Sequence, residues 1–271
     1  MSRQNPDSNA GSPTASPTAA VDRAQLVSYL AELLRPDEGQ DYGPNGLQVE
    51  GRGTIRRLVT GVSACLELFE KAREREADAI LVHHGIFWNG TSPVLTGMQF
   101  RRVRELIASE INLLAYHLPL DRHAELGNNA LAARAFGLTE CQSFAPHKGL
   151  DVGFKGRFAE PITSAELVRR CREIYAQEPL AFLYGPDPIS SLGIVSGGAQ
   201  RDFYAAIAEG LDAYITGEVS EWVMNVAREE GHHFLAAGHY ATERLGIRAL
   251  GKHLAERFGL AVEFIDVPNP V

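Results

Sequence analysis

The sequence predicts an α/β protein made of two related α/β units, in which helices are layered on β-sheets. Apolar segments with strand-like composition alternate with amphipathic helix-like segments along the chain. The last third also echoes the first, since 211–218 resembles 77–84 and 233–239 resembles 112–117. An internal repeat of βαβ units is the simplest explanation. The length of 271 residues is sufficient for two packed units with real cores.

The first unit is expected to span 22–141 and to follow a disordered tail at 1–21. The tail is rich in Ser, Pro, Ala and Thr and has few large apolar residues to bury. Asp22 can cap a helix whose leucines recur at helical spacing until Pro36. A loop of turn-forming residues, 41–51, follows this helix.

The alternation then continues to the end of the chain. In the first unit it predicts strand 57–61, helix 63–76, strand 79–82, helix 98–109 and strand 111–116. A middle α/β insert is expected at 142–190, with strand 152–158, a helix capped by Thr163 and Glu166, and strand 180–183. The second α/β unit then covers 191–271.

Composition excludes several classes of function. The formal net charge is −8, so the chain lacks the basic surface that binds nucleic acid. Cys65, Cys141 and Cys171 are far apart and show no CxxC spacing, which argues against disulfides and thiolate zinc sites and fits the cytoplasm. No segment approaches the roughly 20 apolar residues that cross a bilayer, and no signal-peptide core is present, so no membrane association is expected.

Metal-binding side chains follow the predicted strands of both units. One strand ends in a His-His pair, and two others end in a histidine with a carboxylate four residues later. These residues are His83, His84, His117, Asp121, His239 and Glu243. Open α/β sheets display their ligands beyond the carboxyl ends of strands, and histidines buried there need polar partners. We therefore predict two divalent ions per chain (Zn, Fe, Mn, Co or Ni), with coordination positions left for water or substrate.

Each motif taken alone fits a helix cap or a surface pair equally well. Glu218 could act as a general base or as a carboxylate beside a ligand, or it could simply cap a helix. His123 could shuttle protons near Asp121, or it could be a solvated loop histidine. Tyr42, Asn45 and Gln48 on the turn-rich loop could contact a heterocyclic substrate. A structural or solvated role is expected for the remaining histidines: His147, His232, His233 and His253.

Long motifs in a fixed order add a family resemblance over 22–271. They include DYGPNGLQVEG (41–51), ADAILVHHGIFW (77–88) and AAGHYATERLGIRAL (236–250). The chain resembles the Nif-three-like family of dinuclear-metal proteins, and within it the bacterial YbgI type, called GTP cyclohydrolase I type II homologue. The resemblance implies the same six ligands and a toroidal homohexamer whose metal sites face an internal cavity. Tyr240 stands where close relatives have a second histidine, so it is not expected to be a ligand.

The expected activity is metal-dependent hydrolysis. Two close ions can activate a water and orient it toward a carbonyl or phosphoryl group, and the resemblance favours a nucleotide- or pterin-like small molecule as substrate. The alternative is a metal-handling chaperone or a regulatory scaffold for a protein partner, without turnover.

Overall fold

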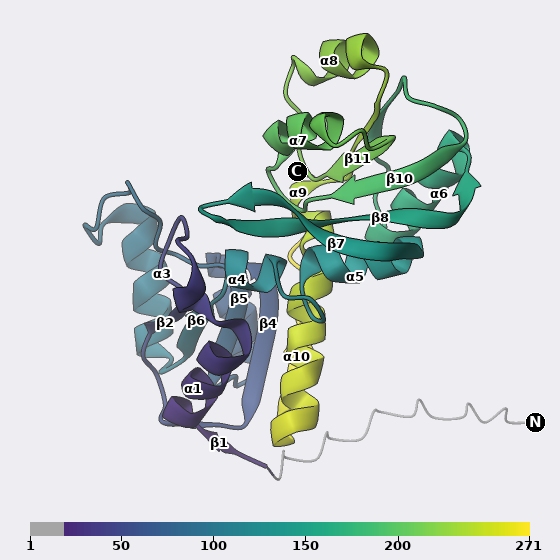
Figure 1. Cartoon of the computed structure of the whole chain (residues 1–271). Helices are drawn as coiled ribbons and strands as arrows, with labels where there is room; N and C mark the ends of the chain where they lie inside the picture. The colour runs from purple at the N-terminus through teal and green to yellow at the C-terminus, as the bar shows by residue number, and fades with distance from the viewer. Residues whose placement is uncertain (1–18) are drawn as a thin grey trace, which may run out of the picture.

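Two β-sheets surrounded by helices organise the part of the chain that the computed structural model describes, residues 19–271 (Figure 1). The prediction of an α/β fold is confirmed. Most of the tail expected at 1–21 lies outside the described residues. Val21 does not belong to a tail, because it is 3% exposed and lies in strand β1 (Val21–Asp22), which pairs with β3 (Thr54–Ile55).

The first sheet has the order β13-β4-β5-β6-β2. Its strands are β2 (Gly46–Val49), β4 (Arg57–Ser63), β5 (Ala79–His84), β6 (Asn112–Ala115) and β13 (Ala261–Phe264). Strands β13, β4, β5 and β6 are parallel, and β2 is an antiparallel edge strand beside β6. The helices of this part of the chain are α1 (Arg23–Leu34), the 3₁₀ turn η1 (Pro36–Glu38), α2 (Leu66–Glu74) and α3 (Gly97–Ala108).

The second sheet has the order β7-β8-β10-β11-β12-β9. Its strands are β7 (Leu138–His147), β8 (Leu150–Ile162), β9 (Leu180–Leu183), β10 (Ile189–Ile194), β11 (Ala213–Thr216) and β12 (His233–Ala236). Strands β10, β11 and β12 are parallel, whereas β9 runs antiparallel to β12. The accompanying helices are α6 (Ser164–Tyr175), the 3₁₀ turn η2 (Gln200–Asp202), α7 (Phe203–Ala208) and α8 (Val223–Glu230).

Both sheets receive their elements in the same order along the chain. A helix and an antiparallel edge strand come first (α1 and β2, or α6 and β9), and three parallel strands with intervening helices follow. The segment expected as a middle insert, 142–190, thus supplies α6 and β9 as the start of the second series. It also supplies most of the β7–β8 hairpin, which has no counterpart in the first sheet.

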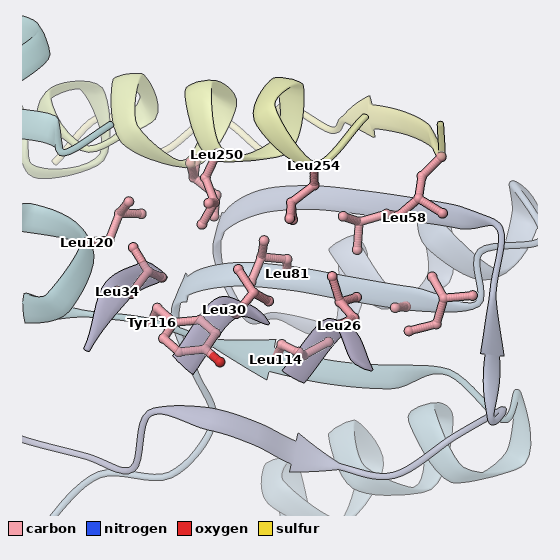
Figure 2. Packing of buried hydrophobic residues seen from close by; sticks show 14 of the residues in the cluster. Leu26, Leu30, Leu34, Leu58, Leu81, Leu114, Tyr116, Leu120, Leu250 and Leu254 are labelled. Carbon is pink, nitrogen blue, oxygen red and sulfur yellow. The ribbon is translucent and has the colours of Figure 1, made fainter. Parts of the chain in front are cut away.

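The last long helix that follows the parallel strands of each sheet packs on the other sheet. Each series ends in a one-turn helix and a longer one: α4 (Leu118–Asp121) and α5 (Asn128–Phe136), then α9 (His239–Thr242) and α10 (Arg244–Phe258). Ala133 and Phe136 of α5 belong to the core beneath the second sheet. Leu250 and Leu254 of α10 instead pack over the first sheet near Leu58 (Figure 2). The sheets therefore group the chain differently from the boundaries at 141 and 190 expected from the sequence.

Of the two helix caps predicted from the sequence, the structure shows one in full and one in part. The Asp22 carboxylate accepts hydrogen bonds from the backbone N–H groups of Ala24 and Gln25 and so caps α1. Thr163 Oγ1 accepts from the Glu166 N–H at 3.2 Å, but the Glu166 carboxylate pairs with arginines of α6 instead of completing a capping box.

The three cysteines are free thiols. No helix within residues 19–271 has the length and apolar character needed to cross a membrane.

Candidate metal centre

The parallel strands bring the six predicted ligands together from both sheets. His83 and His84 are the last two residues of β5, and the chain continues from β6 and β12 into His117 and His239. Each of these last two histidines starts a single helical turn. A spacing of four residues on such a turn places Asp121 beside His117 and Glu243 beside His239.

Glu243 lies at the centre of the cluster. Its Oε1 is 3.4 Å from His83 Nε2 and 3.3 Å from His239 Nε2, and its Oε2 is 3.2 Å from His84 Nε2. Asp121 Oδ2 lies 3.5 Å from His83 Nε2 on the other side. Three overlapping ligand groups, each with its donor atoms within 4.8 Å of one another, together contain all six residues: His83–His84–His117, His84–His239–Glu243 and His83–Asp121–Glu243.

Two atoms at the centre of the cluster lack a well-aligned hydrogen bond. The His83 side chain is fully buried and that of Glu243 is 3% exposed, yet His83 Nε2 and Glu243 Oε2 form no well-aligned hydrogen bond among the described residues. Buried polar atoms without partners are costly, and in native proteins they call for an explanation. Divalent metal ions fit this donor set, because imidazole and carboxylate are ligands that zinc and related metals prefer.

Two of the histidines donate a hydrogen bond to a carboxylate on the side of the ring that faces away from the cluster. His117 Nδ1–H donates to Asp41 Oδ1 at 2.7 Å, and His239 Nδ1–H donates to Glu218 Oε1 at 2.6 Å. Such bonds leave Nε2 as the nitrogen that faces the cluster. Carboxylates behind metal-ligating histidines fix the ring orientation and raise its basicity.

Neutral groups hold the remaining ligands. His83 Nδ1–H donates to the Tyr116 carbonyl at 3.1 Å, and His84 Nδ1 is hydrogen-bonded to Ser63 Oγ at 3.0 Å. Asp121 Oδ1 accepts from Asn128 Nδ2 at 2.9 Å and from Ser196 Oγ at 3.0 Å. Because Ser196 follows β10, both sheets hold this ligand in place.

Interactions between the histidines and carboxylates shift the pKa values of the cluster residues. Burial alone would lower the pKa of His83 and of His239, but the neighbouring carboxylates outweigh it and raise both pKa values to about 9. Burial would raise the pKa of Glu243, but the surrounding imidazoles hold it well below its ordinary value. Burial prevails only at His84, whose pKa is lowered. Without metal, the cluster therefore holds extra protons at neutral pH.

The cluster opens into a cavity of about 690 Å³ lined by residues from both sheets. Trp88 and Tyr42 form an aromatic part of its wall, with ring centres 5.2 and 6.1 Å from that of His117. His147, near the tip of the β7–β8 hairpin, also lines the cavity and pairs through Nε2 with Asp202 Oδ2 at 2.7 Å. The volume lies within the range of small-molecule sites.

Three of the other predicted site residues are not placed for their expected roles. His123 lines a different cavity, and its Nδ1 accepts from the backbone N–H groups of the turn that follows it, so it is not a proton shuttle for the cluster. Asn45 and Gln48 do not line the cavity beside the cluster. Asn45 bonds to Asp41 and to the His117 N–H, and Gln48 bonds to the Pro44 carbonyl and the Ile86 N–H. Their amides stabilise the loops that carry the ligands.

Tyr42 and Glu218 do line the cavity. Tyr240 lines it as well, but its hydroxyl donates to Asp266. Sequence reasoning missed Asp41, although an acidic residue that starts a turn-rich loop is a usable signal. It also set aside His147, and no spacing pattern in the sequence connects this histidine to the cluster.

Comparison with known proteins places this architecture in a family. Residues 21–270 match the model of the Duf34/NIF3 (NGG1p interacting factor 3) family. The chain is 48% identical over 251 residues to a Pseudomonas aeruginosa protein described as a GTP cyclohydrolase 1 type 2 homolog, covering 93% of this chain and 99% of the relative. The Escherichia coli K12 protein of the same description is 44% identical over 250 residues, covering 91% of this chain and 98% of the relative.

Solved structures agree with the sequence relatives. The structure of protein ybgI superimposes with a TM-score of 0.88 at 43% identity, and that of TTHA1606 from Thermus thermophilus with 0.82 at 38%. Both alignments cover 93% of this chain and 100% of the other. HcgD from Methanocaldococcus jannaschii shares the fold, with a TM-score of 0.80 at 21% identity. The resemblance found in the sequence is confirmed, and the chain belongs to the Duf34/NIF3 family.

Proposed function

We propose that this protein is a dinuclear metal-dependent hydrolase that acts on a nucleotide- or pterin-like small molecule. The observation that supports it best is the pair of buried atoms without well-aligned hydrogen bonds, His83 Nε2 and Glu243 Oε2, in a cluster whose other residues line an open cavity. A binding pocket beside ligands with unused donor atoms is the arrangement of a catalytic metal site rather than a closed structural one.

Charge balance supports two ions per chain. Two divalent ions carry four positive charges. Four carboxylates surround the histidines and supply four negative charges: Asp41, Asp121, Glu218 and Glu243. A buried site is most stable when its charges are paired. Glu243 has both oxygens close to histidine nitrogens and would hold the ions together with these histidines.

The chemistry follows from these residues. Bound divalent ions would supply Lewis acidity and lower the pKa of a water at the site to near neutrality. Asp41 and Glu218 keep His117 and His239 in the tautomer that presents Nε2. Glu218 lines the cavity with its side chain 34% exposed, so the carboxylate can also accept a proton from the attacking water. Trp88 gives a planar ring an apolar wall to contact.

A substrate screen tests this proposal. Metal-loaded protein is incubated with nucleotides and pterins in ¹⁸O-water, and the products are analysed by mass spectrometry. We expect one labelled oxygen per turnover and a rate at least about a hundredfold lower in Glu218→Gln, as for loss of a general base. His123→Gln is the matched control and should retain the wild-type rate. Absence of turnover of every nucleotide and pterin with every metal tested would overturn the proposed hydrolase activity.

Metal handling is the second candidate, favoured by the accessibility of the cluster. The side chains of His84 and His239 are 16% and 29% exposed, so ions could exchange through the cavity. Ready transfer of ions to a weak chelator, together with no turnover, would support this function.

The toroidal homohexamer is also a proposal. Exposed apolar side chains around the start of α3 offer a surface for subunit contact: Val94, Leu95, Met98 and Phe100. We expect native mass spectrometry to give six times the chain mass of 29.6 kDa. Substitution of Met98 and Phe100 by serine should lower the assembly state, and a monomeric wild-type protein would contradict the proposal.

A further inference from the structure

Arg102 lines the same cavity as the predicted metal ligands. It lies on α3, three residues after Gln99, whose Nε2 donates to the Ile86 carbonyl at 2.9 Å. Residues three apart share a helix face, so this face of α3 lies against the segment that follows His84. Arg102 is the one lysine or arginine among the described residues that line this cavity.

The guanidinium of Arg102 lacks the partners that a half-buried arginine usually has. Its Nε is buried and has no hydrogen-bond partner within the described chain. The acidic groups of the cavity are engaged elsewhere: Glu218 and Glu243 with histidines, and Asp121 with Asn128 and Ser196. Burying this N–H donor without an acceptor costs free energy.

An oxyanion would satisfy this group. Arginine presents its N–H donors in a planar fork that matches the oxygens of a phosphate or a carboxylate, and such charge-assisted bonds are strong. The chain as a whole is acidic, with a net charge of −8, so an anion needs a local positive group to enter the cavity. Trp88 adds an apolar wall beside His84, with ring centres 5.8 Å apart.

We propose that Arg102 binds an oxyanion, a phosphate or a carboxylate, of the small molecule whose other end reaches the metal centre. This inference rests on the proposed function and narrows its substrate class to anionic small molecules. In this proposal Arg102 positions the substrate in the cavity, and the histidine–carboxylate cluster acts on it.

Binding of inorganic phosphate and of acetate to metal-loaded protein tests the proposal by isothermal titration calorimetry, without any need for turnover. Arg102→Met removes the fork, and Arg102→Lys keeps the charge but not the geometry. Arg101→Met is the matched control, because Arg101 is an exposed neighbour on the same helix. We expect wild type and Arg101→Met to bind equally. Arg102→Met should bind at least about tenfold more weakly, with Arg102→Lys between them.

Metal content of each variant is measured alongside, and the anion that binds more tightly identifies the substrate's charged group. Equal binding by Arg102→Met, no binding of either anion to wild type, or loss of metal from Arg102→Met would overturn the assignment. Arg102-dependent anion binding without any hydrolysis would instead overturn the proposed activity and leave this site standing.

Discussion

At the scale of single residues, the histidine–carboxylate cluster could be predicted from the sequence because much of its geometry is local. A histidine at the end of a strand and a carboxylate four residues later, as in His117 with Asp121 and His239 with Glu243, lie on one helical turn in almost any context. The structure brings these residues together with His83 and His84.

The supporting residues were harder to predict. Asp41 is 76 positions from His117, and Ser196 is 75 positions from Asp121. Only the tertiary fold creates these contacts. His123 lies only two residues beyond Asp121 in sequence, but the chain leaves the helical turn before it and the side chain enters another cavity.

The raised pKa values of His83 and His239 predict proton release on metal binding. At pH 7 both imidazoles are protonated in the metal-free protein, because their pKa values are about 9, and metal ligation requires the neutral ring. We expect release of about two protons per chain, since each of these two rings must lose one. The apparent affinity should rise from pH 6 to about pH 9 and then level off.

Calorimetry in two buffers of different ionisation enthalpy measures the released protons directly. An observed enthalpy that does not depend on the buffer would contradict protonated histidines in the metal-free cluster.

Adjacent glycines provide a second prediction at this scale. A Cβ on Gly197 would lie 2.3 Å from Glu243 Oε1, and its φ of +73° is unfavourable for other residues. A Cβ on Gly198 would meet nothing closer than 3.4 Å. Gly197→Ala should therefore displace the central carboxylate and weaken metal binding at least about tenfold, whereas Gly198→Ala should bind nearly as wild type does. Similar affinities for both variants, measured by chelator competition, would argue against Glu243 as a ligand.

At the scale of elements, periodicity predicted most strands and helices but not their partners. The apolar face of α10 is visible in the sequence, yet nothing in that pattern tells which sheet it covers. The structure places it on the first sheet (Figures 1 and 2). Strand β13 also joins this sheet, beside β4. The same limitation hid the role of α6 and β9, because an antiparallel edge strand after a helix resembles the start of an insert.

The crossing of α5 and α10 connects packing to the site. Gly246 N–H donates to Asn128 Oδ1 at 2.7 Å, and a Cβ at this glycine would come within 2.8 Å of the same oxygen. Asn128 in turn donates to Asp121. Gly246→Ala should lower the free energy of unfolding by about 1–3 kcal/mol through overpacking and should also weaken metal binding. Lys252→Ala, an exposed change on α10, should stay within about 0.5 kcal/mol of wild type.

Denaturant unfolding of the metal-free proteins and metal titration check both effects. If Gly246→Ala lost stability but bound metal like wild type, the helix crossing would not support Asp121.

At the scale of the whole molecule, the site exists because two sheets meet. The first sheet supplies His83, His84 and His117, and the second supplies His239 with Glu218 behind it. The exchange of α5 and α10 joins the sheets through two hydrophobic cores, so neither sheet has its full set of helices without the other. This mutual dependence fixes the distance between ligands that lie far apart in the chain.

We propose that this junction of the two sheets holds two divalent ions. Metal content per chain, measured by plasma mass spectrometry on gently purified protein before and after dialysis against a weak chelator, tests it most directly. We predict about two ions per chain that survive dialysis, because six ligands and two further carboxylates surround them. Glu243→Gln should lose most of this metal, and Glu229→Gln, a change at an exposed position of α8, should not. One ion or none in wild type, or equal retention in Glu243→Gln, would contradict the dinuclear centre.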